Sequence, residues 1–312
     1  MTYALDPELA TWLDMIPDIG AGILNDLPAA RARAKEMLSK RGADYRPTRE
    51  LTIEDTMAGD VPVRVYAPAE RDGLRPGLLY IHGGGFIMGS VGEFDAGVQE
   101  YADRLNIVVV SVDYRLAPEH PYPAPLEDCY TALTWLADKA SDLGVDPERI
   151  GVAGMSAGGG LAAGVTLLSR DRGGPALCLQ YLGIPELDDR LDTPSMRDYV
   201  DTPGFKRPLA VFSWDAYLGK GVRGTADVPI YAAPARATDL TGLPPTVVTA
   251  CQYDPLRDEA IDYAQRLMHA GVLTELRHYA GTFHGSAKIR DAAVTKRQLA
   301  DTIEDLRRGL RA

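Results

Sequence analysis

The chain has 312 residues, of which 46% are hydrophobic and 25% are charged, and its formal net charge is -11. This composition is that of a folded globular protein, and it excludes a fibrous or disordered chain. The acidic balance argues against a nucleic-acid partner, because such proteins neutralise phosphates with lysine and arginine. No segment has the features of a membrane span or a secretion signal, so we expect a cytoplasmic protein without a membrane anchor.

The three cysteines, Cys129, Cys178 and Cys251, are an odd number and lack CxxC spacing. Each lies in an apolar or helical stretch, so we expect buried, reduced thiols rather than disulfides or metal ligands. No cluster of histidine, cysteine and acidic residues indicates a metal site, and the sequence predicts no cofactor.

Residues 1–48 precede the strand patterns and predict two amphipathic helices. Apolar residues recur at spacings of three and four between Leu5 and Ile16, and again between Ile23 and Leu38. Pro47 interrupts the second pattern, and short β-branched runs separated by turns follow it. These runs predict about eight strands, at 51–53, 61–66, 77–81, 107–112, 150–153, 177–182, 246–250 and 274–278.

The later runs indicate a mostly parallel sheet with helices on both faces. The run at 107–112 is apolar without alternation, as a strand buried on both faces requires. Helical patterns at 126–139, 158–170 and 255–270 lie between the runs. An antiparallel start followed by a parallel βα series is therefore the expected sheet.

The stretch between the runs at 177–182 and 246–250 is too long for a simple crossover. It contains several prolines and an aromatic segment with Phe212, Trp214 and Tyr217. We expect one crossover element and an inserted helix or two, which would lean over the functional site together with the N-terminal helices.

A serine flanked by glycines follows the strand pattern at 150–153. In Gly154-Met155-Ser156-Ala157-Gly158, a sharp turn from strand to helix would expose the Ser156 hydroxyl, and the glycines avoid clashes with neighbouring chain. The helix N-terminus behind the serine favours developing negative charge. The alternative is that Ser156 only caps the helix. The run of glycines exceeds what a cap needs, so the pattern favours a nucleophile.

Three glycines follow the strand pattern at 77–81, in His82-Gly83-Gly84-Gly85-Phe86. Acyl transfer creates an oxyanion that preorganised backbone N–H groups stabilise, and glycines leave such groups uncovered. A phosphate-binding loop is the competing use, but the residues that would complete it are missing. We expect His82 to orient the loop by hydrogen bonding rather than to act as a second base. The predicted oxyanion hole consists of the N–H groups of Gly83, Gly84, Gly85 and Ala157.

An acid and a histidine follow the last two strand patterns, after the serine in the chain order of a nucleophile-elbow hydrolase. Asp254 comes after the run at 246–250, and His284 after the run at 274–278. We expect His284 to take the Ser156 proton and pass it to the leaving group, while Asp254 holds the imidazole tautomer. Asp258 is the rival acid, but it is expected to cap or salt-bridge the following helix.

These blocks resemble those of the bacterial hormone-sensitive-lipase-like esterases of the α/β-hydrolase superfamily. The family's HGGG block matches 82–86, its GDSAGG block 154–159, its DYRLAPE region 113–124, and its acid and base blocks 254–258 and 284–285. The resemblance implies an α/β-hydrolase fold with a mostly parallel sheet of about eight strands, flanking helices and a helical cap. The cap would comprise residues 1–48 and an insertion at about 190–225, and the catalytic domain residues 49–312.

The resemblance also implies that cap and loop residues line a substrate pocket, with packing against the core as the alternative role. The pocket candidates are Phe86, Trp214, Tyr217 and Phe283, with Trp12, Ile16, Ile23 and Phe212 as further cap positions.

Two positions depart from the family pattern. Met155 stands where relatives usually carry Asp or Glu, and Ser286 stands where a large aromatic residue often lies. Met155 removes a carboxylate that would anchor the elbow, and it makes Glu119 a candidate buried carboxylate with one changed partner.

The expected activity is hydrolysis of short- to medium-chain carboxylic esters, with a small-molecule ester as the partner. Amide or peptide hydrolysis uses the same three residues and stays open. A ligand-binding receptor on the same fold is a further alternative, but such receptors typically lose the histidine that is His284 here. The sequence leaves a homodimer open.

Overall fold

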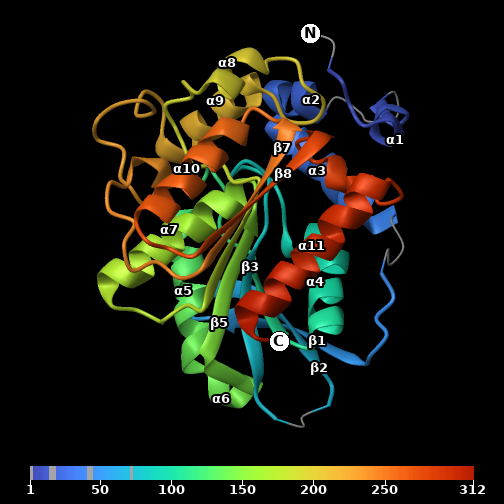
Figure 1. Cartoon of the computed structure of the whole chain (residues 1–312), viewed down its shortest axis with the longest axis vertical. Coiled ribbons are helices and arrows are strands. Elements are labelled where there is room, and N and C mark those ends of the chain that lie inside the picture. The colour runs from blue at the N-terminus through green and yellow to red at the C-terminus, as the bar shows by residue number, and fades with distance from the viewer. Residues whose placement is uncertain (1–2, 14–18, 41–44, 71–72) are drawn as a thin grey trace.

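One eight-stranded sheet forms the centre of the molecule (Figure 1). The computed structural model describes residues 3–13, 19–40, 45–70 and 73–312. All of the predicted strands are present, and several are longer than expected. They are β1 (Leu51–Ala58), β2 (Val61–Pro68), β3 (Arg75–Ile81), β4 (Val108–Val112), β5 (Val145–Met155), β6 (Leu179–Gly183), β7 (Thr246–Tyr253) and β8 (Thr274–Phe283).

The sheet is antiparallel at one edge and parallel elsewhere, as predicted. Its strand order is β1-β2-β4-β3-β5-β6-β7-β8. Strand β2 pairs antiparallel with β1 and with β4, and the remaining neighbours are parallel. Because parallel strands end at the same edge of a sheet, the loops that follow β3, β5, β7 and β8 meet at one end of the molecule.

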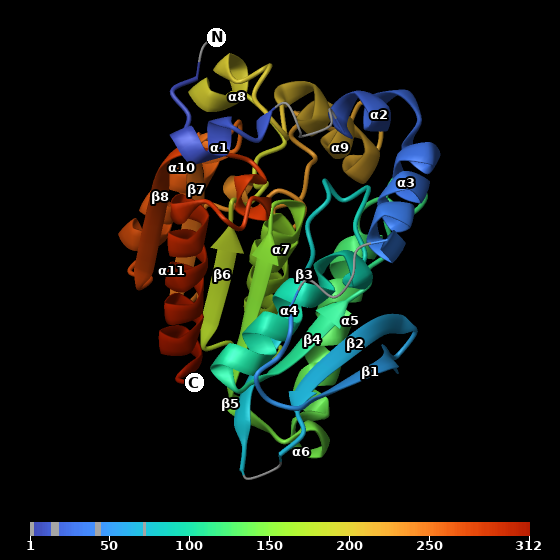
Figure 2. The same ribbon diagram turned by 90° about the vertical axis from the view of Figure 1, so that its right-hand side faces the viewer.

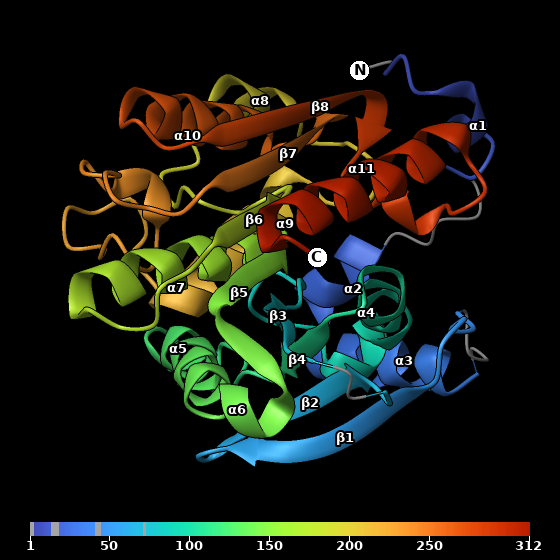
Figure 3. The same ribbon diagram turned by 60° about the horizontal axis from the view of Figure 1, so that its bottom comes forward.

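Helices cover both faces of the sheet (Figure 3). Helices α5, α7 and α10 pack on one face, and α4 and α11 pack together on the other. Neighbouring residues of β3 enter different cores, since Leu79 belongs to one hydrophobic cluster and Leu78 to another. This two-sided burial explains why the central strands are apolar throughout. The helices are α4 (Val91–Leu105), α5 (Ala124–Asp138), α6 (Ala140–Leu143), α7 (Ala157–Arg172), α10 (Arg257–His269) and α11 (Ala293–Leu310).

The N-terminal helices and the inserted region lie beyond the ends of the parallel strands (Figure 2). They comprise α1 (Pro7–Ala10), α2 (Ile19–Asn25), α3 (Leu27–Lys40), α8 (Pro194–Asp198) and α9 (Arg207–Leu218). Among the N-terminal residues that the structure describes there are three helices, where the sequence predicts two. The first is a single turn whose N-cap is Asp6, and the Asp6 side chain accepts the N–H of Glu8 at 2.9 Å. Ile16, expected on the first helix, lies outside the described residues.

The three cysteines are free thiols. Cys129 and Cys251 are buried, as predicted. Cys178 is only partly buried because it precedes the first residue of β6, so the prediction of burial is wrong there. Among the helices that the structure describes, none is long and apolar enough to cross a membrane.

Candidate active site

Ser156 lies in a strained turn between β5 and α7. Its backbone has φ 57° and ψ −124°, a combination that few residues other than glycine adopt. The turn is crowded: a Cβ atom on Gly154 would lie 2.0 Å from the carbonyl oxygen of Gly158. A Cβ atom on Gly158 would lie 2.2 Å from the carbonyl oxygen of Ile81. The Ser156 side chain forms no capping hydrogen bond to α7, so the capping interpretation does not hold.

The side chains of Ser156, His284 and Asp254 form one continuous hydrogen-bonded line. The Ser156 hydroxyl lies 2.9 Å from His284 Nε2, and His284 Nδ1 lies 2.7 Å from Asp254 Oδ2. Asp254 is 1% exposed, and its Oδ1 accepts the N–H of Leu256 at 2.9 Å. With both carboxylate oxygens accepting, Nδ1 of His284 carries the hydrogen and Nε2 is left to accept from serine.

Asp258, the rival acid, points elsewhere. Its carboxylate accepts from Arg257 Nε at 2.7 Å and from the N–H of Ser195 at 2.7 Å. These contacts fasten the start of α8 to the start of α10, which is the salt-bridging role that the sequence predicts.

The glycine loop lies directly against the serine. A Cβ atom on Gly83 would lie 3.3 Å from Ser156 Cβ and 2.7 Å from the carbonyl oxygen of Met155. The backbone of Gly84 has φ 130°, and a Cβ atom there would lie 2.1 Å from the carbonyl oxygen of Met88. Only glycine fits this approach. Ala157, which follows Ser156, is the first residue of α7.

His82 holds the glycine loop in the manner predicted. It is fully buried, and its Nδ1 donates to the carbonyl oxygen of Gly83 at 2.9 Å. Its ring stacks on Tyr114 at 4.3 Å between centroids, and the Tyr114 hydroxyl donates to the His82 carbonyl oxygen at 3.0 Å. Burial lowers the pKa of His82, which favours the neutral ring.

Comparisons with known proteins identify the family of this chain. A family model described as alpha/beta hydrolase fold matches residues 78–288. Carboxylesterase NlhH of Mycobacterium tuberculosis is 40% identical over 290 residues, which cover 90% of this chain and 88% of that protein. The solved structure of a bacterial heroin esterase is 47% identical, with a TM-score of 0.91 and 99% of each chain covered. The chain belongs to the hormone-sensitive-lipase-like esterases of the α/β-hydrolase superfamily.

This esterase is a serine hydrolase of the carboxylesterase type. A further relative is arylacetamide deacetylase of Bos taurus, which is 34% identical over 312 residues, with 80% of this chain and 78% of that protein covered.

Met155, at which the sequence departs from the expected family pattern, packs in the esterase as an apolar residue. Its side chain lies over Gly183 of β6, where a Cβ atom would come within 2.1 Å of the Met155 sulfur. It also packs against the hydrophobic cluster under α4 and α11. The prediction that Glu119 is a buried carboxylate is wrong, because its side chain is 53% exposed and pairs with Arg31 of α3 at 2.8 Å.

The predicted pocket residues of the esterase are buried in two separate groups. Phe86 stacks on Tyr217 at 4.2 Å and contacts Trp214 at 5.3 Å between ring centroids. Phe283 packs instead with Leu9 of α1. All four residues are at most 1% exposed. In the structure these four residues pack against neighbouring side chains, and their role in lining a substrate pocket stays a prediction.

Two residues near the triad were not predicted from the sequence. Phe205, in the segment before α9, lies with its ring 4.9 Å from the imidazole of His284. Glu186, which follows β6, is fully buried and donates its N–H to the carbonyl oxygen of Ser156 at 3.0 Å. An acidic residue three positions after an apolar strand was the available signal for Glu186.

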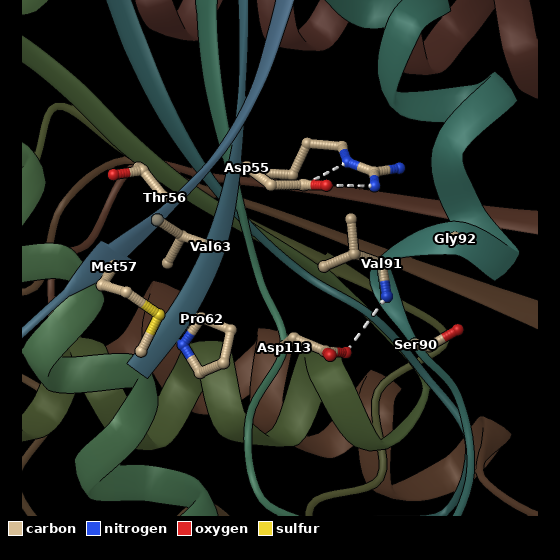
Figure 4. A pocket seen from close by; sticks show the side chains of 10 residues that line it. Asp55, Thr56, Met57, Pro62, Val63, Ser90, Val91, Gly92 and Asp113 are labelled. Atoms are coloured by element: carbon tan, nitrogen blue, oxygen red, sulfur yellow. Dashed lines mark hydrogen bonds and ion pairs between the residues drawn. The ribbon is translucent and has the colours of Figure 1, made fainter. Parts of the chain in front are cut away.

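A surface pocket of about 390 Å³ lies away from the triad (Figure 4). It lies between the β1–β2 hairpin and the start of α4, where Asp113 accepts the N–H of Val91 at 3.2 Å. Arg64 pairs with Asp55 at the same pocket, at 2.6 Å. These contacts satisfy the charged groups locally.

Proposed function

We propose that Ser156, His284 and Asp254 hydrolyse carboxylic esters through an acyl-enzyme. The observation that carries this proposal is the unbroken hydrogen-bonded line, with 2.9 Å between Ser156 Oγ and His284 Nε2 and 2.7 Å between His284 Nδ1 and Asp254. A serine in this arrangement is a nucleophile with its general base in contact.

The reaction follows from the positions of the protons. His284 Nε2 takes the Ser156 proton as the oxygen attacks the ester carbonyl, and Asp254 stabilises the imidazolium. The imidazolium then protonates the leaving alcohol, which leaves an acyl group on Ser156. Water, deprotonated by His284, attacks the acyl group, and the acid product leaves as Ser156 regains its proton.

The oxyanion of each tetrahedral intermediate would be held by backbone N–H groups. We assign this role to the glycine loop and to the first residue of α7, whose N-terminus carries partial positive charge. The contact of Gly83 with Ser156 Cβ supports the assignment. Loss of one such donor typically costs about 2.7–4 kcal/mol of transition-state stabilisation. The donors proposed are those of Gly83, Gly84, Gly85 and Ala157.

The cap proposed for this site consists of residues 1–48 and the insertion at about 190–225, over a catalytic domain of residues 49–312. The contact of Phe205 with His284 and the place of α1, α2, α8 and α9 beyond the strand ends support it (Figure 2). A cap over the site limits the length of the acyl chain that it can take, so we propose short to medium chains as the preferred substrates.

A series of p-nitrophenyl esters from acetate to palmitate tests the substrate class. We expect the highest kcat/KM between acetate and octanoate, and a fall at laurate and palmitate. Turnover that rises toward palmitate would contradict the proposed chain length, and absence of turnover with every ester would contradict ester hydrolysis.

Amide hydrolysis is the second candidate, and the likeness to an arylacetamide deacetylase favours it. The same triad serves both bonds, but an amine leaves less readily than an alkoxide or phenolate. The ratio of kcat/KM for p-nitrophenyl acetate to that for p-nitroacetanilide decides between them. An anilide turned over as well as the ester would move the assignment to amides.

A further inference from the structure

Glu186 is a buried carboxyl group beside the proposed nucleophile, and the reaction steps above do not use it. It is fully buried in the segment after β6. Its N–H donates to the carbonyl oxygen of Ser156 at 3.0 Å. A Cβ atom on Gly160 of α7 would lie 2.1 Å from its carbonyl oxygen. The backbone of Glu186 is thus clamped to the turn that carries Ser156.

The side chain of Glu186 reaches α9. Its Oε1 lies 2.6 Å from Ser213 Oγ, and its Oε2 has no hydrogen-bond partner among the described residues. Ser213 in turn lies against the glycine loop, since a Cβ atom on Gly85 would lie 3.2 Å from Ser213 Cβ. One short hydrogen bond therefore joins α9 to the segment clamped to the nucleophile turn, and the glycine loop packs against the same serine.

The two oxygen atoms near Ser213 Oγ indicate whether Glu186 is protonated. Ser213 Oγ also lies 3.1 Å from the carbonyl oxygen of Ala210, which can only accept. A protonated Glu186 would donate to Ser213, and Ser213 would donate to Ala210, so both hydrogens find an acceptor. An ionised Glu186 would instead be a buried charge with one donor and one bare oxygen, which is costly.

The charged groups around Glu186 oppose its ionisation as well. The titratable groups that act on it or are acted on by it, among the described residues, are Asp254 after β7, Glu259 of α10 and Tyr114 after β4. None of them is a cation. Burial raises the pKa of Glu186 to about 8 and outweighs the hydrogen bond with Ser213, which lowers it; Asp254 makes a smaller contribution that raises it.

We propose that Glu186 is a positioning residue that works as a neutral carboxylic acid, donating to Ser213 and so holding α9 and the glycine loop against the nucleophile. The proposal rests on the ester hydrolysis proposed above. Because the loop would stabilise the transition state rather than bind the ground state, loss of the link lowers kcat more than it raises KM.

Glu186→Gln imitates the neutral carboxylic acid and cannot form the anion. The glutamine amide keeps an N–H donor for Ser213 and does not ionise. We expect Glu186→Gln to keep kcat within about threefold at pH 7, and Glu186→Ala and Ser213→Ala to lose about tenfold, which is the scale of one hydrogen bond. The wild-type protein should lose kcat/KM with an apparent pKa near 8, and Glu186→Gln should not. Glu54→Gln on the exposed side of β1 is the matched control and should follow the wild type.

Two results would overturn the proposal: a Glu186→Gln enzyme as impaired as Glu186→Ala, or a wild-type profile above pH 7 with the same shape as that of Glu186→Gln. Either would mean that the neutral acid is not the working form.

The melting temperature tests whether Glu186 is protonated in the folded protein, and it does so without an activity measurement. Between the ordinary pKa of 4.5 and the folded value of about 8, the folded protein keeps a proton that the unfolded chain releases. Glu186 therefore costs stability increasingly as pH rises through this window. The melting temperature of Glu186→Gln minus that of wild type should rise from pH 5 to pH 8 and then level off. A constant difference contradicts the proposal, whereas an absence of ester turnover contradicts only the proposed function.

Discussion

The loops that carry Ser156 and His284 are held by different kinds of contact. Around Ser156 the partners are backbone atoms of the central sheet and of the segments that follow β3 and β6. The Ser156 N–H donates to the carbonyl oxygen of Gly183 at 2.8 Å, and the glycines on either side touch backbone too closely for any side chain. This turn is set by the sheet itself.

Around His284 the partners come from distant parts of the chain. The N–H of Asp6 donates to the carbonyl oxygen of Gly281 at 2.9 Å, and Leu9 packs with Phe283. A Cβ atom on Gly204 would lie 2.4 Å from the carbonyl oxygen of His284, and Phe205 contacts the imidazole. Changes in the N-terminal segment, or in the part of the insertion that precedes α9, should therefore act through the base rather than through the nucleophile.

Ser156→Ala has the largest expected effect, and it tests the turn that carries Ser156. Because the triad acts as a unit, loss of the nucleophile should lower kcat by about five to six orders of magnitude. The melting temperature should not fall, since the hydroxyl makes no capping bond. Kinetics with p-nitrophenyl butyrate and a thermal melt measure the two effects. Activity above about one percent of wild type would show that another nucleophile acts.

The sequence predicts the parts of the site that depend on local pattern better than those that depend on distant segments. The glycine turn, the glycine loop, Asp254 and His284 follow strands directly, so local pattern and chain order were enough to place them. Phe205 and Glu186 were not predicted, because their importance depends on where a long insertion folds back. Met155 could be interpreted only with Gly183, a partner on another strand. Helices α4 and α11 were also missed as elements, although they supply six of the 15 buried residues of one core.

Asp254→Asn tests the hydrogen bond between Asp254 and His284. The amide would favour the wrong imidazole tautomer, and kcat should fall by about four orders of magnitude. Asp258→Asn is the matched control: its amide oxygen still accepts the Ser195 N–H, and a partly exposed ion pair contributes about 0–1 kcal/mol. Parallel measurements of kcat for the two variants decide the acid. If Asp258→Asn proved the weaker enzyme, the assignment would pass to Asp258.

Leu9→Ala tests whether the N-terminal segment holds the base. Leu9 is 0% exposed, so its truncation should cost about 2–5 kcal/mol of unfolding free energy. Leu24, which is 39% exposed, provides the matched change, and Leu24→Ala should cost no more than about 0.5 kcal/mol. Urea unfolding measures both. The kcat of Leu9→Ala should fall as well, because Phe283 precedes His284; an unchanged kcat in the destabilised protein would separate α1 from catalysis.

Phe205→Ala is the smallest and most selective of these changes. Its half-buried ring contacts the imidazole of His284, and such ring contacts contribute about 0.5–1.5 kcal/mol, or about twofold to tenfold in kcat/KM. Phe205→Leu keeps apolar bulk without the ring face and isolates that contribution. If Phe205 orients the base, both variants should lower kcat equally for acetate and octanoate esters. If it lines the acyl pocket instead, the ratio between the two esters should change while kcat for acetate stays near wild type. An equal fall in kcat for both esters would show that the insertion, like the N-terminal segment around Leu9, holds the base. A changed ratio between the esters would instead show that the insertion contacts the substrate.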